Sequence, residues 1–420
     1  MKMKIDEIGY ATINDIRARS ASEKSPMVRC DMVLTDRCTF RCPYCQGIRE
    51  DCQGSVSMEE AKRMIDLWTE NGLMELRLTG GEPTVWPGIV ELVKYAKSRG
   101  TRSVGLSTNA FSDLALYNEL IDAGVDVFSI SLDACNPEIG DRMSGGIKGS
   151  WYKVTANIRE ISKRAYVWLG IVTTAETAKD LPETIDFALS LGVHDIKLVS
   201  ASQYNQLLTS AGLISKKPRE EHPLLNYRIT NMEHGRNIRG LTEYDSHRCP
   251  LVLDDSSFAG GYHFPCTLYM RERGKPIGIP NENMRQDRAE WYRRHDSHKD
   301  PICSAYCIDF FVEYNNRYLD FRLKDQKKVP VLDPKLFSVE NYDRNGKARI
   351  GAENMTFDNV SAYADSLLHH PDYELLGICL TDDMSDKPVV PKCSALLYKA
   401  KNGEHFWFTV KSSELGEILL

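Results

Sequence analysis

The sequence lacks any long apolar run. No segment of its 420 residues approaches the roughly 18 consecutive apolar residues of a membrane-spanning helix, and residues 1–10 mix charged with apolar side chains instead of forming a signal-peptide core. A basic excess is also absent, because 53 Lys and Arg stand against 59 Asp and Glu, which gives a net charge of −6. Duplex-DNA binders usually carry a basic surface that offsets the phosphates. We therefore expect a cytoplasmic protein without a membrane partner, and nucleic acid is not an expected partner.

Internal repeats and low-complexity segments are absent too, so a globular chain of two or three domains is expected. Cysteine is the residue that stands out. The chain has 12, which is many for a reducing compartment, where thiols outside a packed core are usually metal ligands or catalytic groups. Three of them fall within residues 38–45 and four between 249 and 307. This uneven distribution favours two metal sites over a disulfide framework.

Residues 28–200 alternate short β-branched or apolar runs with longer helical patterns. The expected strands cover residues 31–35, 73–79, 102–108, 125–133, 166–173 and 195–200. The expected helices between them cover residues 57–71, 86–99, 112–123, 151–163 and 181–191, and glycines follow several of them. This order predicts an α/β fold whose six parallel strands form a partial barrel or an open sheet, with the site on the loops after the strands.

The rest of the chain divides into three expected parts. Residues 201–248 lose the alternation of strands and helices, so we expect a segment that connects the barrel to the next part. Residues 249–325 are rich in Cys, Gly and aromatic residues, which indicates a small metal-organised unit. From residue 327 to 420 we expect an α+β unit with a helix at 359–369 and a strand at 375–380. Its hairpin of residues 395–400 and 405–410 surrounds Asn402-Gly403, the strongest short hairpin signal.

The first cysteine group is Cys38-Thr-Phe-Arg-Cys42-Pro-Tyr-Cys45, directly after the first expected strand. Three thiolates in one loop can hold three irons of a [4Fe–4S] cube and leave the fourth iron open, as catalytic metal sites do. The alternative is a zinc knuckle that takes a fourth ligand from elsewhere, for example Cys52.

The second expected strand ends in Thr79-Gly80-Gly81-Glu82-Pro83, where two glycines allow close backbone approach and Glu82 offers a carboxylate. Together with Cys38, Cys42 and Cys45, this segment resembles the radical S-adenosylmethionine (SAM) superfamily, over about residues 28–200. The resemblance implies a partial (β/α)6 TIM-type barrel. It also implies that the open iron binds the amino and carboxylate groups of SAM, and that an electron delivered by a donor such as flavodoxin or ferredoxin yields a 5′-deoxyadenosyl radical.

The same resemblance implies which residues contact SAM. Tyr44 matches the aromatic residue that flanks the adenine, and residues 80–83 match the segment that holds the methionyl ammonium. Residues that end the third and fourth strands match positions that contact the ribose and carboxylate: Thr108, Asn109, Ser131 and Asp133. From the residues alone, a Ser or Asp at a strand end is equally a turn or cap former, and Glu82 could simply brace the turn before Pro83.

The second cysteine group comprises Cys249, Cys266, Cys303 and Cys307, with Gly261 five residues before Cys266. Four cysteines in this arrangement could bind zinc, and His295 and His298 lie nearby in the sequence. In a chain that resembles radical SAM enzymes, the pattern is also similar to the auxiliary-cluster extension called twitch, a relative of SPASM. That resemblance implies one auxiliary [4Fe–4S] cluster. Cys135, after the fourth strand, is a candidate hydrogen-atom donor.

For the substrate, residues 34–38 and 76–83 resemble the GTP cyclase of molybdenum-cofactor biosynthesis, in which a counterpart of Arg77 helps to hold the nucleotide. Asp31 departs from that family by replacing a substrate-binding arginine, and residues 168–172 lack the expected lysine. We therefore expect a small polar substrate, such as a nucleoside or sugar, that is oxidised, cyclised or epimerised, with Arg271 as a further contact. The alternatives are a peptide maturase and a zinc-organised protein without enzymatic activity.

Overall fold

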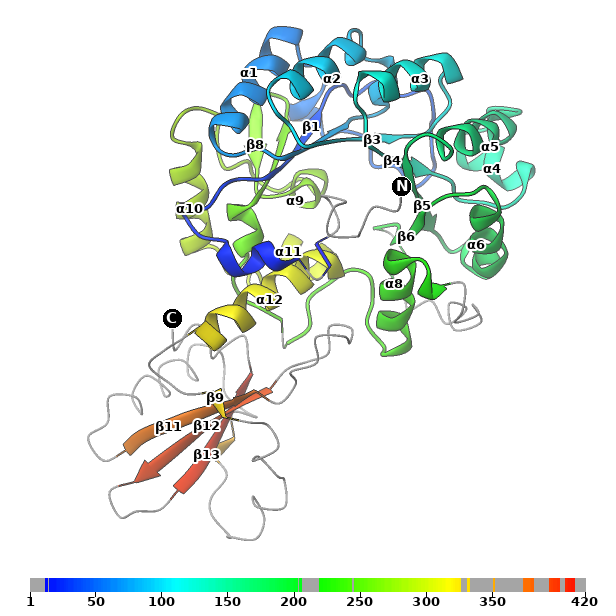
Figure 1. The fold of residues 1–420 in the computed structure, drawn as a ribbon. Helices are drawn as coiled ribbons and strands as arrows, with labels where there is room; N and C mark the ends of the chain where they lie inside the picture. The colour runs from blue at the N-terminus through cyan, green and yellow to red at the C-terminus, as the bar shows by residue number, and fades with distance from the viewer. Residues whose placement is uncertain are drawn as a thin grey trace.

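The computed structural model describes residues 12–13, 15–202, 204–205, 219–243 and 245–325, together with the strands named below in the C-terminal part (Figure 1). The expected helix at 359–369 lies outside the described residues. No helix in the described part of the chain is both long enough and apolar enough to cross a membrane.

The first six strands form in the expected places and run parallel. They are β1 (Arg29–Val33), β2 (Glu75–Thr79), β3 (Ser103–Thr108), β4 (Val127–Ser131), β5 (Tyr166–Thr173) and β6 (Asp195–Ser200), hydrogen-bonded in sequence order. The expected helices also form, as α1 (Met58–Glu70), α2 (Ile89–Ser98), α3 (Leu114–Ala123), α5 (Ser150–Ile161) and α6 (Leu181–Ser190). A short helix, α4 (Pro137–Met143), was not expected from the sequence. The α/β fold is confirmed.

Short-range signals explain where these helices begin and end. The Ser57 side chain accepts a hydrogen bond from the Glu60 N–H and so begins α1. Gly124 ends α3 in the left-handed conformation, with φ of 115°, which glycine adopts without strain. The apolar faces of these helices pack on the sheet in one core that contains the buried Trp68 and Leu106. The loops at the carboxyl ends of the strands are thereby fixed on a rigid frame.

The sheet continues beyond β1. β7 (Asp255–Ala259) pairs with β1 in parallel, and β8 (Tyr262–Phe264) pairs with β7 as a hairpin, so the sheet has eight strands. Gly260 and Gly261 form the turn, both with positive φ (57° and 82°), as a two-residue hairpin turn requires. The first two strands of residues 249–325 therefore continue the barrel sheet.

Four helices contribute residues to the cavity of the second cysteine group, namely α9 (Thr267–Arg271), α10 (Met284–Arg294), α11 (Pro301–Tyr306) and α12 (Asp309–Asp325). Helix α8 (Pro223–Glu233) packs on β6 instead. A second sheet of five strands follows, in the order β10 (Ile350–Gly351), β13 (His405–Lys411), β12 (Cys393–Ala400), β11 (Tyr373–Leu380) and β9 (Val331–Leu332). The antiparallel pairing of β12 with β13 confirms the expected hairpin.

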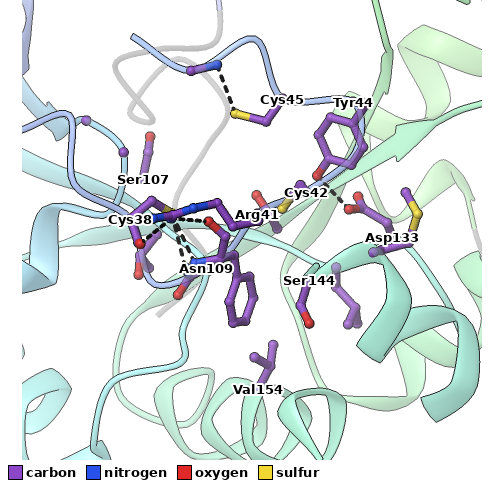
Figure 2. A pocket seen from close by; sticks show the side chains of 18 of the residues that line it. Cys38, Arg41, Cys42, Tyr44, Cys45, Ser107, Asn109, Asp133, Ser144 and Val154 are labelled. Atoms are coloured by element: carbon purple, nitrogen blue, oxygen red, sulfur yellow. Dashed lines mark hydrogen bonds between the residues drawn. The ribbon is translucent and has the colours of Figure 1, made fainter. Parts of the chain in front are cut away.

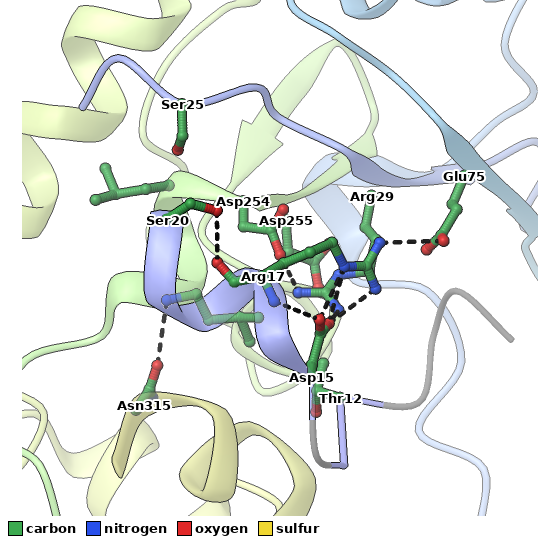
Figure 3. Close-up of polar contacts among 12 residues, drawn as sticks. Thr12, Asp15, Arg17, Ser20, Ser25, Arg29, Glu75, Asp254, Asp255 and Asn315 are labelled. Atoms are coloured by element: carbon green, nitrogen blue, oxygen red, sulfur yellow. Dashed lines mark hydrogen bonds and ion pairs between the residues drawn. The ribbon is translucent and has the colours of Figure 1, made fainter. Parts of the chain in front are cut away.

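A buried ion-pair network joins the amino-terminal segment to the base of the sheet (Figure 3). Arg29, at the start of β1 and fully buried, pairs with Asp15 at 2.7 Å and with Asp254 just before β7. Arg17 pairs with Asp15 and with Glu75 at the start of β2. Because buried charges without partners are strongly destabilising, this network fixes β1, β2 and β7 relative to one another.

Candidate active site and second cysteine site

A cavity of about 500 Å³ lies at the carboxyl ends of β1 to β4 (Figure 2). It is lined by the cysteines at positions 38, 42 and 45. Seven of the nine expected SAM contacts also line it, namely Tyr44, Gly80, Gly81, Thr108, Asn109, Ser131 and Asp133. Arg271 reaches the same cavity from the end of α9. The fold thus brings the cysteine loop, the carboxyl ends of four strands and Arg271 to the same cavity.

The two glycines after β2 are required by close packing. A Cβ atom at Gly80 would lie 2.6 Å from the Thr35 carbonyl oxygen, and one at Gly81 would lie 2.3 Å from the Arg37 carbonyl oxygen. The Gly81 N–H donates to Thr35 O at 2.7 Å, and the Glu82 N–H donates to Arg37 O at 2.8 Å. No side chain fits there, so the glycines hold the cysteine loop against the end of β2.

Glu82 does not line this cavity. Its carboxylate is 1% exposed and accepts hydrogen bonds from both the N–H and the hydroxyl of Thr84, from the Thr108 hydroxyl at 2.7 Å and from the Asn109 N–H at 2.7 Å. Burial raises the pKa of this carboxyl group, and these donors oppose the rise. Three of these hydrogen bonds end on Oε1 and one on Oε2. The expected contact with a methionyl ammonium stays a prediction. Glu82 braces the ends of β2 and β3, the alternative that the sequence left open.

Tyr44 and Asp133 are linked across the cavity. The Tyr44 hydroxyl donates to one Asp133 oxygen at 2.6 Å (Figure 2). The Val172 N–H donates to the other oxygen at 2.8 Å. Burial raises the pKa of Asp133 to about 6, and the Tyr44 hydroxyl bond opposes that rise. The bond joins the aromatic residue of the cysteine loop to the end of β4, so the ring's position depends on both elements.

The surroundings of the three cysteines suit thiolate ligands. The Phe40 N–H donates to the Cys38 sulfur at 3.4 Å, and the Gly47 N–H donates to the Cys45 sulfur at 3.3 Å. Burial raises the pKa of Cys42 to about 12, so this thiol carries its proton at neutral pH unless a metal displaces it. Backbone N–H groups directed at sulfur are the contacts that tune iron–sulfur clusters. The residues therefore fit a cluster.

A smaller cavity of about 110 Å³ lies deeper in the barrel and is lined from both β6 and β7. Five of its lining side chains are cationic, namely Arg29, Arg77, Lys197, Arg228 and Arg239, and Asp255 is its one acidic lining residue. The four arginines form ion pairs with acidic residues that do not line the cavity. These pairs are Arg29 with Asp15 and Asp254, Arg77 with Asp31, Arg228 with Asp309, and Arg239 with Glu272. The cavity wall therefore presents mainly the N–H groups of cationic side chains, while most of the carboxylates that pair with these cations lie outside the lining.

Lys197 is the cation that sequence reasoning missed. Its ammonium lies 5.2 Å from the Phe310 ring centroid, and within the described chain no carboxylate lies at ion-pair distance from it. Burial, together with the nearby Arg228 and Arg77, lowers its pKa to about 7, and the carboxylates of Asp309 and Asp31 oppose this shift. A lysine in the middle of an otherwise apolar strand was the available signal, because period-2 alternation points it to the barrel interior.

Arg77 does lie in the barrel interior, as expected, but it pairs with Asp31. The Thr267 hydroxyl donates to the same Asp31 oxygen. Asp31, the position at which the sequence departs from the cyclase resemblance, thus neutralises the charge of Arg77. Cys135 and Pro83 do not line either of these two cavities, and the roles expected for them stay predictions.

The second cysteine group converges on a cavity of only about 30 Å³. All four of Cys249, Cys266, Cys303 and Cys307 line it, among mostly apolar neighbours. Burial raises the pKa of each thiol, that of Cys249 to about 11. Among the described residues, one group of three metal-ligating side chains has all its ligand atoms within 4.8 Å of one another, namely His295, Asp300 and Cys303. No three of the four cysteine sulfurs meet that limit, whereas sulfurs on one zinc ion lie about 3.8 Å apart at Zn–S bonds of about 2.3 Å.

Comparison with known proteins identifies the barrel. The sequence model of the Radical SAM superfamily matches residues 32–188. The chain contains a radical SAM domain. The matched domain begins within β1 and ends in α6, so it includes the cysteine loop and the double-glycine segment. The enzyme expected from the sequence is thereby confirmed at the level of the superfamily, which implies SAM and a [4Fe–4S] cluster as cofactors.

Relatives of the radical SAM domain carry more specific names. GTP 3',8-cyclase 1 of Pseudomonas aeruginosa is 28% identical over 298 residues, which cover 65% of this chain and 85% of that protein. The GTP 3',8-cyclase of Crocosphaera subtropica is 32% identical over 177 residues, which cover 40% of this chain and 49% of that protein. The chain thus spans about half the length of several of these relatives. Among solved structures, the tagged form of anSMEcpe with bound AdoMet has a TM-score of 0.50 at 12% identity and covers 70% of this chain and 96% of that one, a likeness of fold alone.

Proposed function

We propose that this enzyme reductively cleaves SAM and abstracts a hydrogen atom from a small anionic substrate of the nucleotide or sugar class. The observation that carries the proposal is the 500 Å³ cavity, in which three cysteines of one loop face polar strand ends. When bound, the cluster supplies the electron that breaks the sulfonium bond of SAM. The chain's own residues bind and orient both reactants.

In this proposal Cys38, Cys42 and Cys45 hold the SAM cluster. The polar side chains at the ends of β3 and β4 hold SAM, and the Tyr44 ring, fixed by its bond to Asp133, flanks the adenine. The methionyl group is held by backbone groups beside Gly81, since the Glu82 carboxylate already accepts hydrogen bonds from Thr84, Thr108 and Asn109. Glu82 acts indirectly, by keeping the ends of β2 and β3 in place.

The substrate is expected in the barrel interior, between Arg271 and the cationic cavity. No described carboxylate lies at ion-pair distance from Lys197, so a negatively charged group of the substrate would pair with its protonated form. The names of the cyclase relatives support a nucleotide-like substrate. The Asp31–Arg77 pair argues against the same triphosphate contacts, because it removes one cation and occupies another. A peptide substrate is the alternative.

For the second cysteine group we propose one auxiliary [4Fe–4S] cluster on Cys249, Cys266, Cys303 and Cys307. Two features support it. The sulfurs are spread more widely than a single zinc ion requires, and N–H groups of Asn315 and Tyr269 face two of them. With four cysteine ligands and a closed apolar cavity, its role is electron transfer or structural support. An external donor such as flavodoxin or ferredoxin would reduce the enzyme.

The test is anaerobic purification followed by iron and zinc analysis, and then incubation with SAM and dithionite. We expect about eight irons per chain for two cubes and production of 5′-deoxyadenosine. A panel of nucleotides, sugars and short peptides, deuterated at carbon, then reports which class transfers deuterium into 5′-deoxyadenosine. Stoichiometric zinc without iron would reject the proposal, and transfer from a peptide alone would replace the substrate class.

A further inference from the structure

His295 lies directly behind one of the auxiliary cysteines. Its Nε2 is 3.3 Å from the Cys303 sulfur, and the described His295 side chain does not line the small cavity that the four cysteines share. The imidazole therefore lies on the outer side of Cys303. A ligand to the cluster would lie on the inner side, among the cysteines, so this placement is that of a hydrogen-bond partner of the sulfur.

Two aromatic rings fix the orientation of this imidazole. It stacks on Trp291, with ring centroids 3.8 Å apart and planes 18° apart, and the edge-on ring of Tyr269 lies at 6.1 Å and 89°. A carboxylate oxygen of Asp300 lies within 4.8 Å of the His295 ring nitrogen. The Tyr269 hydroxyl donates to Asp300 at 2.9 Å, and Asp300 in turn accepts the Cys303 N–H at 2.9 Å. The ring and the cysteine are thus held by one set of contacts, so their separation is set by the fold.

We propose that His295 is a positioning residue that donates its Nε2–H to the Cys303 sulfur and so raises the reduction potential of the auxiliary cluster. This inference rests on the auxiliary cluster proposed above. A cysteine that binds iron has lost its proton, so the sulfur can only accept and the imidazole must donate. Reduction adds negative charge to the cluster, and a donor directed at sulfur stabilises the reduced form more than the oxidised form.

The other sulfur contacts show why this donor matters. Cys266 accepts from the Tyr269 backbone N–H at 3.4 Å, and Cys249 accepts from the Asn315 side chain at 3.6 Å. The His295 contact is the shortest of the three. Since the cavity is small and its lining mostly apolar, little solvent is available to substitute for a lost donor. Removal of this one N–H should therefore change the potential measurably.

The experiment uses the full chain with Cys38, Cys42 and Cys45 replaced by alanine, so that the auxiliary cluster alone gives the signal. His295→Phe keeps a ring against Trp291 and removes the donor. His298→Phe is the matched control, because the Nε2 of His298 lies 2.9 Å from the Asp245 carbonyl oxygen and faces no sulfur. His295→Gln returns an N–H on a side chain of similar length. Iron content and an EPR-monitored redox titration are measured for each variant.

We expect His295→Phe to retain its iron and to lower the reduction equilibrium constant by about tenfold, which is about 59 mV for a one-electron couple. His295→Gln should recover part of that change, and His298→Phe should show none. An unchanged potential, or loss of iron in His295→Phe alone, would overturn the inference in favour of a packing residue or a ligand. If the parent variant holds no iron, the proposed auxiliary cluster itself fails, and the inference with it.

Discussion

The two cysteine sites differ in how much space surrounds them. The first lies in a cavity of about 500 Å³ with polar strand ends on its walls, and the second in a cavity of about 30 Å³ with apolar walls. Three cysteines of one eight-residue loop serve the first, whereas the second draws its four from segments up to 58 residues apart, Cys249 to Cys307. The comparison teaches that one site has room for a ligand beside its cysteines and the other does not.

The largest expected effect tests whether the sites are independent. Replacing Cys38, Cys42 and Cys45 with alanine should remove about four irons and abolish 5′-deoxyadenosine production, while about four irons remain at the second site. Iron analysis and product chromatography of anaerobic preparations check this. Continued SAM cleavage would show that the first site is not the SAM cluster, and iron near zero would show that the second site holds none.

The converse change tests the closed site. Cys307→Ala should remove the auxiliary cluster and lower the thermal midpoint, because the four cysteines line the small cavity beneath α11 and α12. SAM cleavage without substrate should persist, since that chemistry needs only the first site. Cys135→Ala is the control, because Cys135 lines neither cysteine cavity. If SAM cleavage disappears in Cys307→Ala while iron at the first site is retained, the two sites are functionally coupled.

A smaller effect is expected for Glu82→Gln. The amide group introduces donors where four donors already face the carboxylate, so we expect the free energy of unfolding to fall by about 1–3 kcal/mol with little change in SAM affinity. Thermal midpoint and SAM affinity are measured on the same preparations. Glu91→Gln is the matched control, because Glu91 is 63% exposed and its partner is a surface lysine. A tenfold loss of SAM affinity with an unchanged midpoint would support the direct contact.

A further effect concerns pH and the barrel interior. The pKa of Lys197 is about 7 in the folded protein, whereas an unfolded chain keeps a lysine protonated to above about pH 10. The unfolded state therefore binds the extra proton between these values, so stability rises with pH across this window. In Lys197→Met that rise should disappear, and the variant should exceed wild type in thermal midpoint most clearly below about pH 7. Substrate affinity in wild type should fall above about pH 7, by up to about tenfold per pH unit.

Much of the barrel could be predicted because its signals are local. Period-2 and helical patterns separated by glycine stops placed six strands and five helices, and the Asn402-Gly403 turn placed the β12–β13 hairpin. The pairing of β7 with β1 could not be predicted in this way. It joins Arg29–Met32 to Asp255–Phe258, more than 200 residues later, and depends on the edge that β1 leaves open rather than on a local pattern.

In the candidate site, too, the residues with local sequence signals could be predicted, and those whose contacts are long-range could not. The cysteines and glycines were recognisable because their spacing is fixed by the ligand and by close backbone packing. The partners of Glu82 could not be predicted, because sequence shows that a carboxylate is present but not where it is directed, and here Asn109 and Thr108 donate to it. Lys197 was overlooked because the alternation shows only which side of the strand it faces, whereas the cationic cavity that it lines is formed by residues of distant elements.

The pairing of β7 with β1 also decides how this protein can be divided. A fragment that ends before residue 249 would contain the whole matched domain, residues 32–188, yet it would expose the full length of β1 as a sheet edge. It would also leave Arg29 without Asp254. An uncovered edge of apolar strand pairs readily with other chains. The shortest soluble unit of this enzyme should therefore extend through β8, and fragments designed from the family boundary should aggregate.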